Sequence, residues 1–443
     1  MVNVRETGAI GDGVTKDTLA VQKAIDSNDK VFFPAGIYLC GTLYLHSNTT
    51  LELENGAVIL GSPDPEDYNK ADFCVQNTAC IQEKASGAHL IVALECSNVT
   101  IRGGKIDGNY PAFFDPEKCT RDQFEGWRPS QMIFLCECTR ILLEDVELTR
   151  SPYWACFLHG CSDAVIRGVK VWNHPRVWNG DGLDIDCCSG VIVTGCNIES
   201  SDDSLAIRAA GKDRLKYHKE GICEDIVVSN CILKSGQAAI RIGVGSGTVR
   251  RCIFSNISVR ASSFGICMLS TYLPGIFKKG ASGVQIEDIL FSDMILHAGS
   301  PIDISANWID APLESSCKEI RNVTIRNIRA YGTRTSILQG NCDRKLKDVL
   351  ISDCSFIISG GERISEDPSG VHPRGFEVYL RSCAFYIVNA ESLSFRNCSI
   401  RFQEESENYL ETIRIADDSE IAFSACEIHP PRNGVATRKK IDL

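Results

Sequence analysis

A pattern of short strand-forming segments that repeats from about residue 98 constrains the fold of this chain more than any other feature. In each copy, a polar turn precedes two or three alternating apolar residues, and a second turn, often with Asn or Asp, leads into another short strand. The copies recur at intervals of about 22 to 35 residues, and examples are SNVTIRGGKIDG, SDAVIRGVKVWN, SGVIVTGCNIES and LKDVLISDCSFII. Short strands repeated at this spacing are typical of a solenoid, a propeller or another array.

Of these architectures, a parallel β-helix fits the repeat best. Propeller blades run to ~40 residues or more and carry signatures that this chain lacks, and a sandwich does not explain so many copies. A chain of 443 residues is too long for one ordinary core unless it repeats or divides into domains. We therefore predict an all-β fold, a right-handed parallel β-helix with Ile, Val, Leu, Cys and Phe inside. One domain is predicted over 1–443, with coils over about 31–430 and a C-terminal tail at 431–443.

Residues 1–30 predict a cap for the open end of the coils. A strand at Val2–Val4 and a Gly/Asp turn lead into the helix that the pattern indicates, with Thr15 or Asp17 as its N-cap. A solenoid needs such a cap because its terminal coil otherwise leaves a strand edge and apolar side chains in water. The apolar face of this helix is predicted to consist of Leu19, Val21, Ala24 and Ile25.

The 22 cysteines predict buried free thiols rather than disulfides or a metal site. Most stand singly before an apolar or β-branched residue, as in GCNI, NCIL and DCSF, and there is no CxxC pair. The adjacent Cys187 and Cys188 have poor spacing for zinc ligands. Because free cysteine behaves as a small hydrophobe, we expect a reducing compartment, the cytoplasm, and no metal or other cofactor.

Charge and hydropathy limit the partners of the chain. A net charge of −11 argues against nucleic acid and against an anionic membrane surface, but it is compatible with sugars and small metabolites. The N-terminus has no cationic stretch followed by an apolar run, and no segment reaches the ~20 apolar residues of a membrane span. We therefore expect no nucleic-acid or membrane partner, and the oligomeric state stays open.

Carboxylates gather in the stretch from Trp178 to Ala210, which is otherwise strand-forming. Asp181 lies 21 residues before Asp202 and 22 before Asp203, which suits the length of one coil. Neighbouring coils are separated by about 4.8 Å, so we predict that these carboxyl groups converge on one patch. Such a cluster is costly unless it is paired, bound to metal or used, and it provides a geometry for acid–base cleavage. Insertions that wall a binding face are expected at 107–131, 211–221, 272–283 and 360–375.

Five segments follow one another in a recognisable order: GAIGDGVTKDTLAVQKAID, GGKIDGN, LTRSPYWACFLHGC, NGDGLDID and SSDDSLAI. Together they resemble the polygalacturonase family, glycoside hydrolase family 28, over nearly the whole chain. The resemblance implies an inverting glycoside hydrolase in which Asp202 is the general acid and Asp181 with Asp203 activates the attacking water. Carboxylate chemistry agrees, because like charges held together raise the pKa of one group. Inversion also needs room for a water, with acid and base ~6.5–9.5 Å apart.

Two segments depart from the family pattern and change the expected substrate. The family's Gly-His-Gly aligns with SGQAAIRIG, which places Gln237 where histidine is expected, and its Arg-Ile-Lys aligns with GICMLS, which leaves Cys267–Leu269. A neutral Cys-Met-Leu surface cannot pair with a uronate, whereas Arg208 and Arg241 are cations near the site in sequence. We therefore predict an exo-acting hydrolase of plant pectin-type oligosaccharides that is not a standard polygalacturonase, with a leaving-group sugar that is neutral or differently bound.

Residues around the acidic stretch are candidates for substrate binding, and several also have a structural alternative. Asp184 alternates with apolar residues and is expected to face solvent or cap a turn if it binds nothing. Trp154 is otherwise expected to pack within a coil, and Gln237 to join an interior amide ladder. His159 and His174 are weaker candidates as bases, since a lone histidine is usually only hydrogen-bonded. The predicted substrate-binding set is Asn179, Asp184, Arg208, Gln237, Arg241, Trp154 and Trp178.

Two other function classes stay open. A β-helix lyase or sugar epimerase needs a base that takes the proton next to a uronate carboxylate, plus a neutralising cation, and the loss of Arg-Ile-Lys weighs against it. A catalytically silent carbohydrate-binding protein is suggested by the missing histidine. Binding alone, however, does not require Asp181, Asp202 and Asp203 to be held together.

Overall fold

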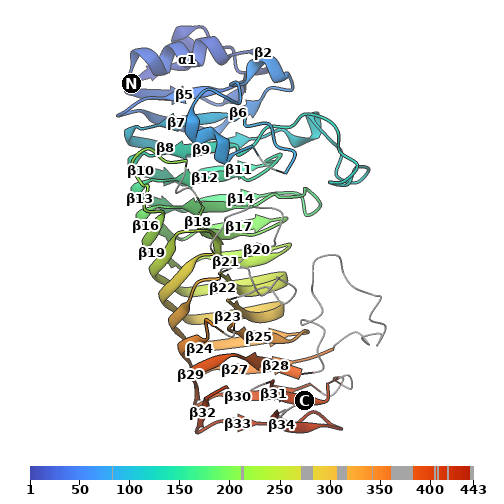
Figure 1. Cartoon of the computed structure of the whole chain (residues 1–443). Coiled ribbons are helices and arrows are strands. Elements are labelled where there is room, and N and C mark those ends of the chain that lie inside the picture. Colours follow the sequence, from blue (N-terminus) through green and yellow to red (C-terminus); the bar gives the residue numbers. More distant parts are fainter. Residues whose placement is uncertain are drawn as a thin grey trace. The chain divides into compact units, whose positions relative to one another are not determined.

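The chain forms two compact units, each built from parallel strands wound into coils (Figure 1). A computed structural model describes residues 1–81, 83–210, 214–270, 283–306, 317–341, 343–360, 383–403, 406, 409–416 and 419–439. Unit 1 comprises Met1–Ala206 and Gly211–Gly236, and unit 2 comprises Ile207–Ala210 and Gln237–Leu443. The predicted parallel β-helix is confirmed. One domain over 1–443 stays a prediction, and 440–443 of the expected tail lie outside the described residues.

Unit 1 contains α1 (Thr18–Ser27), the one α-helix among the described residues, and four short 3-10 helices: η1 (Val4–Thr7), η2 (Pro65–Asp67), η3 (Val75–Ala79) and η4 (Tyr110–Ala112). Its strands are β1 (Val2–Asn3), β2 (Asp12–Lys16), β3 (Lys30–Phe33), β4 (Gly36–Cys40), β5 (Leu43–Leu45), β6 (Thr50–Gly61), β7 (Ile91–Leu94), β8 (Ser97–Asp107), β9 (Ile133–Cys136), β10 (Thr139–Glu144), β11 (Glu147–Thr149), β12 (Cys156–His159), β13 (Ser162–Arg167), β14 (Lys170–Trp172), β15 (Leu183–Asp186), β16 (Ser189–Thr194), β17 (Asn197–Ser200), β19 (Ile222–Ser229) and β20 (Ile232–Ser235).

The strands of unit 2 are β21 (Ala238–Gly245), β22 (Thr248–Leu269), β23 (Gln285–Ser305), β24 (Ile320–Gly332), β25 (Ser336–Gln339), β26 (Leu346–Ser352), β27 (Ser355–Ile358), β28 (Cys383–Val388), β29 (Ala390–Arg396), β30 (Ser399–Phe402), β31 (Glu411–Ile415), β32 (Ile421–Ser424), β33 (Glu427–Ile428) and β34 (Val435–Lys439). The remaining strand, β18 (Leu205–Ala209), contains residues of both units.

Three parallel sheets run through unit 1, because each coil contributes a strand to each of them. The first is β5–β7–β9–β12–β15. The second is β3–β6–β8–β10–β13–β16–β19, and the third is β4–β6–β8–β11–β14–β17–β20, so the long strands β6 and β8 enter both. In unit 2, the first sheet is β21–β22–β23–β25–β28–β31–β34.

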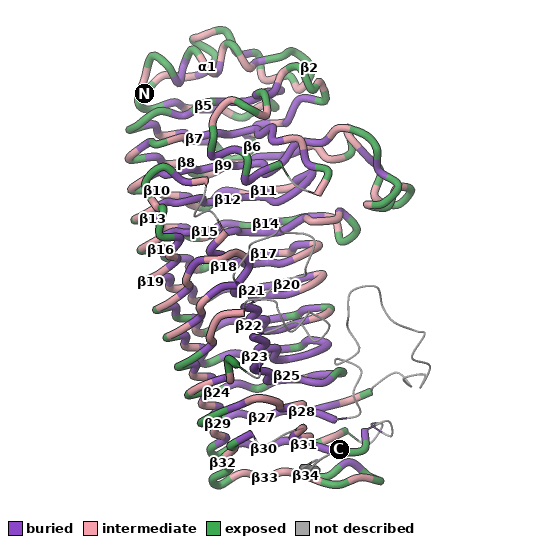
Figure 2. The backbone as a smooth tube through the Cα atoms, in the orientation of Figure 1, coloured by how far each residue is buried: buried purple, intermediate pink, exposed green. Residues whose placement is uncertain are grey.

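The core lies inside the coils and is filled by one alternate set of side chains from each strand. On the second sheet of unit 1, Ile141, Ala164, Val191 and Ile226 are fully buried or nearly so and occupy equivalent positions on successive coils. Ile192, the next residue along its strand, is 45% exposed. This period of two explains the alternation in the sequence, and each buried aliphatic side chain stabilises the fold by about 1.5–3 kcal/mol. Buried residues recur along the coils of both units (Figure 2).

The helix α1 begins close to where the sequence predicts, but its contacts differ from the expectation. Asp17 is the N-cap residue, yet its carboxylate accepts hydrogen bonds from the backbone N–H groups of Ile10 (2.7 Å) and Gly11 (2.9 Å) rather than from the helix. Val21, Ala24 and Ile25 are buried as predicted. The prediction for Leu19 is wrong, because its side chain is 86% exposed.

Turn residues in the left-handed region explain the recurrent Asn and Asp of the repeat. Asp293 (φ 58°) in β23 and Asn327 (φ 52°) in β24 occupy equivalent corner positions of unit 2, and Asn327 Nδ2 donates to Asp293 Oδ1 at 2.6 Å. Asn and Asp tolerate this backbone conformation better than other residues with a Cβ atom. The pairing links successive coils at their corners, so these residues keep one coil in register with the next.

The described cysteines are all free, and most are buried, as the sequence predicts. Five of them form a column inside unit 1, and thiols in it donate to backbone carbonyls of the neighbouring coil: Cys96, Cys138, Cys161, Cys188 and Cys223. Over the described part of the chain, no helix combines the length and apolarity needed to cross a bilayer.

Candidate active site

Backbone pairing places Asp181 beside Asp203 on neighbouring coils of unit 1. Gly182 N donates to Asp203 O at 2.9 Å, and Leu183 N donates to Ser204 O at 3.0 Å. This parallel register sets the residue before Gly182 opposite the residue before Ser204. The backbone therefore has the one-coil offset that the spacing of the aspartates predicts.

Serine hydroxyls and close backbone packing fix the turn that carries Asp202. Ser200 Oγ and Ser235 Oγ both donate to Asp202 O, at 2.9 and 2.6 Å. Ser201 N donates to Gly180 O at 3.2 Å, which ties this turn to the chain just before Asp181. Contacts from three coils therefore hold the backbone of Asp202.

The three predicted catalytic carboxylates differ in exposure. Asp181 is 6% and Asp203 8% exposed, whereas Asp202 is half-buried. Asn179 lies beside them, and its Nδ2 faces Asp202 Oδ2 at 3.5 Å. Asn179 Oδ1 is buried and has no hydrogen-bond partner among the described residues. Burying carboxylates costs free energy unless they are paired or used in a reaction. The burial of Asp181 and Asp203 is therefore consistent with a functional site.

Asp184 and Asp186 lie on the next strand positions and are buried, so the solvent-facing alternative for Asp184 is wrong. Both have at most 1% of their surface exposed. Asp184 is opposite Phe157 in the ladder, and Asp186 Oδ2 contacts Nδ1 of His159 at 2.9 Å. His159 is itself fully buried and stacks on Phe157, with ring centroids 5.0 Å apart. Sequence analysis treated His159 as isolated, and the 27-residue offset of one coil is the signal that could have found its partner.

An aromatic cluster stands beside the acidic stretch, and we call it the aromatic wall: Phe114, Phe124, Val177 and Trp178. The Trp178 ring lies 4.4 Å from Phe114 and 5.4 Å from Phe124, centroid to centroid. Its partners come from the insertion at 107–131, so that insertion packs immediately before Asn179, as expected of a walling loop. Sugar binding by the half-buried Trp178 stays a prediction.

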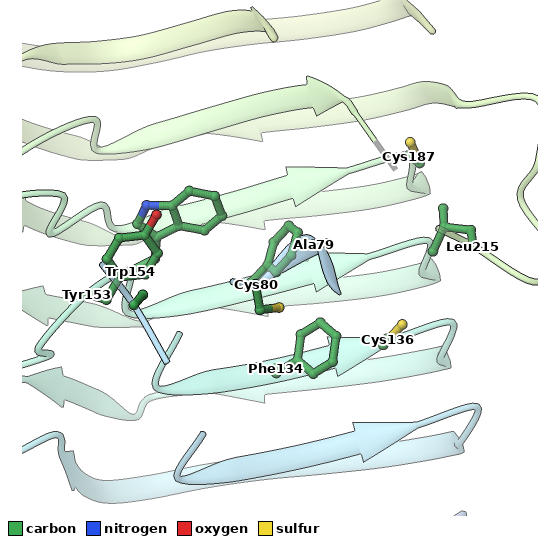
Figure 3. Close-up of a cluster of buried hydrophobic side chains, with 10 residues drawn as sticks. Ala79, Cys80, Phe134, Cys136, Tyr153, Trp154, Cys187 and Leu215 are labelled. Atoms are coloured by element: carbon green, nitrogen blue, oxygen red, sulfur yellow. The ribbon is translucent and has the colours of Figure 1, made fainter. Parts of the chain in front are cut away.

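Trp154 belongs to a second buried cluster, drawn in Figure 3. Its side chain is 3% exposed and stacks on Tyr153 at 5.0 Å, with 16° between the ring planes. Phe134 and Cys136 of β9 pack in the same cluster against Cys80 and Leu215, which lie on loops. This burial supports the packing alternative for Trp154.

A short segment of the predicted 211–221 insertion crosses over these strands, and we call Leu215–Tyr217 the strap. Lys216 Nζ contacts Glu95 Oε1 at 2.9 Å, and Tyr217 OH donates to Glu95 Oε2 at 3.1 Å. Tyr217 N donates to Glu137 Oε1 at 2.6 Å. Glu95 and Glu137 follow β7 and β9, so the strap reaches back over several coils. The sequence predicted the insertion but not these contacts.

The other predicted binding residues, Arg208, Gln237 and Arg241, belong to unit 2. Arg208 and Arg241 are 8% and 5% exposed, and Gln237 O accepts from Phe264 N at 2.9 Å. Arg241 Nη1 contacts Cys267 Sγ at 3.2 Å, and that sulfur lies 3.8 Å from Oδ2 of a buried carboxylate, Asp303. The ladder puts these last three on successive strands, β21, β22 and β23. Asp303 escaped sequence analysis, because its alternation with apolar residues is common to every coil.

Comparison with known proteins identifies similar chains. Residues 67–363 match the family model described as glycosyl hydrolases family 28, and residues 1–119 match one described as rhamnogalacturonase A/epimerase, pectate lyase-like. An exopolygalacturonase of Zea mays is 24% identical over 336 residues, covering 68% of this chain and 78% of the relative. An exo-poly-alpha-D-galacturonosidase of Dickeya chrysanthemi is 43% identical over 298 residues, covering 56% of this chain and 48% of the relative.

Solved structures show the same fold at low sequence identity. An exopolygalacturonase from Thermotoga maritima superimposes with a TM-score of 0.60 at 22% identity, covering 81% of this chain and 87% of that one. A family 28 exopolygalacturonase from Yersinia enterocolitica gives a TM-score of 0.60 at 17% identity, covering 100% and 78%.

Proposed function

Because the chain belongs to glycosyl hydrolases family 28, the pectin-degrading hydrolases, we propose that it is an inverting, exo-acting hydrolase of pectin-type oligosaccharides. The observation that carries the proposal is the backbone register that sets Asp181 beside Asp203, with Asp202 adjacent and half-buried. The two relatives described above are both named for exo-acting enzymes on galacturonans.

In the proposed mechanism, the three aspartates divide the acid and base roles. Asp202 donates a proton to the glycosidic oxygen of the leaving sugar, and Asp181 with Asp203 takes a proton from the attacking water. Inverting hydrolysis needs one carboxyl that gives a proton and another that takes one. The water attacks the face of the sugar ring opposite the departing oxygen, so the anomeric configuration inverts. Asn179, facing Asp202, is proposed to orient that carboxyl.

The aromatic wall and the strap support exo action. Both cover parts of unit 1 that adjoin the acidic stretch: the aromatic wall stands immediately before Asn179, and the strap crosses the strands whose last member carries Asp184 and Asp186. A polymer that continues on both sides of the scissile bond needs a groove that is open at both ends. The two covered surfaces are proposed to limit the site to a chain end.

The leaving-group sugar is proposed to be either neutral or a uronate that is bound differently from the family pattern described above. The neutral segment Cys267–Leu269 is buried and offers no cation to a carboxylate. Arg208 and Arg241 are the proposed alternatives for an acidic sugar, and otherwise the leaving-group sugar is neutral. Comparing hydrolysis of oligogalacturonides with that of neutral analogues, whose carboxyl groups are reduced to alcohols, distinguishes an acidic from a neutral leaving-group sugar.

The test of the function uses Asp202→Asn and proton NMR of the products from short oligogalacturonides. We expect wild type to release single sugars with inverted configuration, and Asp202→Asn to lose about 10²–10⁴-fold in kcat, the usual contribution of a general acid. Asp163→Asn is the control, because Asp163 is an exposed residue near the start of β13 with φ 54°, a conformation that Asn adopts readily. Full activity in Asp202→Asn, retained configuration, or an unsaturated product typical of a lyase would each contradict the proposal.

A further inference from the structure

Arg128 is a fully buried cation that joins three separate segments of unit 1. Its Nη1 donates to Pro152 O at 2.9 Å and to Trp178 O at 3.0 Å, and its Nη2 donates to Glu83 O at 2.9 Å. The guanidinium carbon also lies 4.8 Å from the ring centroid of Tyr153 and 5.0 Å from that of Trp178. The planar fork of donors suits carbonyls that approach from different directions.

The Arg128 side chain remains a cation at neutral pH. Burial lowers the pKa of Arg128 to about 10, which still leaves it protonated. A buried cation is costly unless hydrogen bonds and ring faces compensate for lost water. Closing the loops does not by itself require such a group, because exposed or half-buried cations can do so.

Lys84 ties loops together in this way in the same part of unit 1, with a smaller loss of hydration than Arg128. Its Nζ lies 2.7 Å from Phe124 O, 3.1 Å from Arg121 O and 3.2 Å from Asp122 O, and the residue is exposed. Lys84 therefore ties the 107–131 insertion to the segment before β7. The feature that distinguishes Arg128 is its contact with Trp178.

Trp178 is the residue before Asn179, and the backbone of Asn179 is held in the left-handed region, with φ 54°. Such a conformation is unfavourable for most residues with a Cβ atom, so it persists only where neighbours hold the chain. Arg128 fixes the Trp178 carbonyl, and the aromatic wall fixes its ring. The next side chain then faces Asp202, and Asp181 follows two residues later.

We propose that Arg128 is a positioning residue for the hydrolysis: by holding Trp178, it sets the direction of Asn179 toward Asp202 and the entry of the chain to Asp181. This inference rests on the proposed function. Arg128 is sealed from solvent and contacts no reacting atom, so it acts through the backbone of residues 178–181. Its hydrogen bonds to the carbonyl oxygens of Pro152 and Glu83 anchor the side chain.

The test compares Arg128→Met, Arg128→Lys and the control Lys84→Met, with near-UV circular dichroism to confirm folding. We expect Arg128→Met to lower kcat by about 10–100-fold with a change in KM below about threefold, while Lys84→Met retains wild-type kcat. Arg128→Lys restores the charge but not the three-way fork and should recover only part of the rate. Unchanged kcat in folded Arg128→Met, or an equal loss in Lys84→Met, would overturn the inference.

A double-mutant comparison tests the route through Asn179. If Arg128 acts by directing Asn179, then adding Arg128→Met to Asn179→Ala should lower kcat much less than Arg128→Met does in the wild-type background. If the two substitutions instead lower kcat by independent factors that multiply in the double variant, that route is contradicted.

Hydrogen exchange separates a failure of this inference from a failure of the proposed function. Should the wild-type protein hydrolyse no pectin-type oligosaccharide, the function is wrong, but the positioning role still predicts a local change. Peptides that cover 178–183 should then exchange faster in Arg128→Met and not in Lys84→Met. Equal exchange in the two variants would show that Arg128 does not hold this segment.

Discussion

At the scale of single residues, two glycines permit the close approach of backbones at the candidate active site. A Cβ atom at Gly236 would lie 2.0 Å from Ser201 O, and one at Gly180 would lie 2.2 Å from Ser201 Oγ. Ser201 immediately precedes Asp202, so a larger residue at Gly236 displaces the turn that carries this carboxylate. The contact at Gly236 is the more severe, because backbone cannot rotate away as a hydroxyl can.

We therefore expect Gly236→Ala to destabilise the protein by about 3 kcal/mol, the upper range for overpacking, and to lower kcat through displacement of Asp202. Gly195→Ala is the matched control: Gly195 has φ 65°, and an added Cβ would meet nothing closer than 3.8 Å. Only conformational strain is then introduced, at about 1 kcal/mol. Urea unfolding midpoints and kcat measure both effects. A smaller loss of stability in Gly236→Ala than in Gly195→Ala would contradict this explanation.

Sequence analysis located site residues whose separation along the chain equals the length of one uninterrupted coil. Asp181 and Asp203 are such a pair, and their backbones are adjacent. Arg128 was missed, because 24 to 50 residues separate it from its carbonyl partners. Because Arg128 binds backbone carbonyl oxygens, no acidic residue in the sequence identifies its partners. Long-range contacts of this kind depend on loop paths, which the repeat does not encode.

At the scale of elements, the strap depends on a carboxylate whose protonation should release it. The hydrogen bond and charge of Lys216 lower the pKa of Glu95 below its usual value of 4.5, with a further contribution from Tyr217. A carboxyl whose pKa is lowered by folding stabilises the structure above the unfolded-state value, and this contribution disappears as pH falls through the folded-state value. The strap should therefore loosen below about pH 4.5.

We expect hydrogen exchange of peptides covering 214–217 to accelerate as pH falls from about 6 to 3, after correction for intrinsic rates. Glu95→Gln should exchange faster than wild type at pH 6 and show a weaker dependence on pH. Glu52→Gln is the control, since Glu52 pairs with Arg102 on β6 and β8 and does not contact the strap. An unchanged strap in Glu95→Gln at pH 6 would mean that Glu137 and the apolar contact of Leu215 suffice.

Elements that follow the repeat were predictable, and elements that interrupt it were predictable only as insertions. The alternation in β10, β13 and β16 gives both the strand and the buried face, because a period of two has one solution in a coil. In α1, the same reasoning misassigned Leu19, since the helix rests on the coils along a narrower stripe than its composition indicates. The path of the strap was not predictable, because its partners lie on earlier coils.

At the scale of the whole molecule, the cysteines link composition to fold and to the proposed reducing compartment. Each coil must fill the same interior width, and a small apolar side chain with a weak donor fits next to a carbonyl of the neighbouring coil. Cys161 Sγ donates to Leu135 O at 3.2 Å, for example, and Cys398 Sγ donates to Ile351 O at 3.4 Å. Burial raises the pKa of Cys161 well above its usual value, so its thiol is unreactive at neutral pH.

This arrangement predicts how thiol-specific reagents will titrate the protein as isolated, without added reductant. In the native state, rapid reaction among the described cysteines should be limited to the few that are not buried, which are Cys74, Cys119, Cys317 and Cys426. Cys342 lies outside the described residues. In urea, all 22 should react, because every interior thiol becomes accessible at once. Prior reduction should change neither number. Fewer reactive thiols in urea before reduction than after it would reveal disulfides, and the proposal of a reducing compartment would then have to be abandoned. Rapid native reaction at many more positions would mean instead that the thiols do not lie inside the coils.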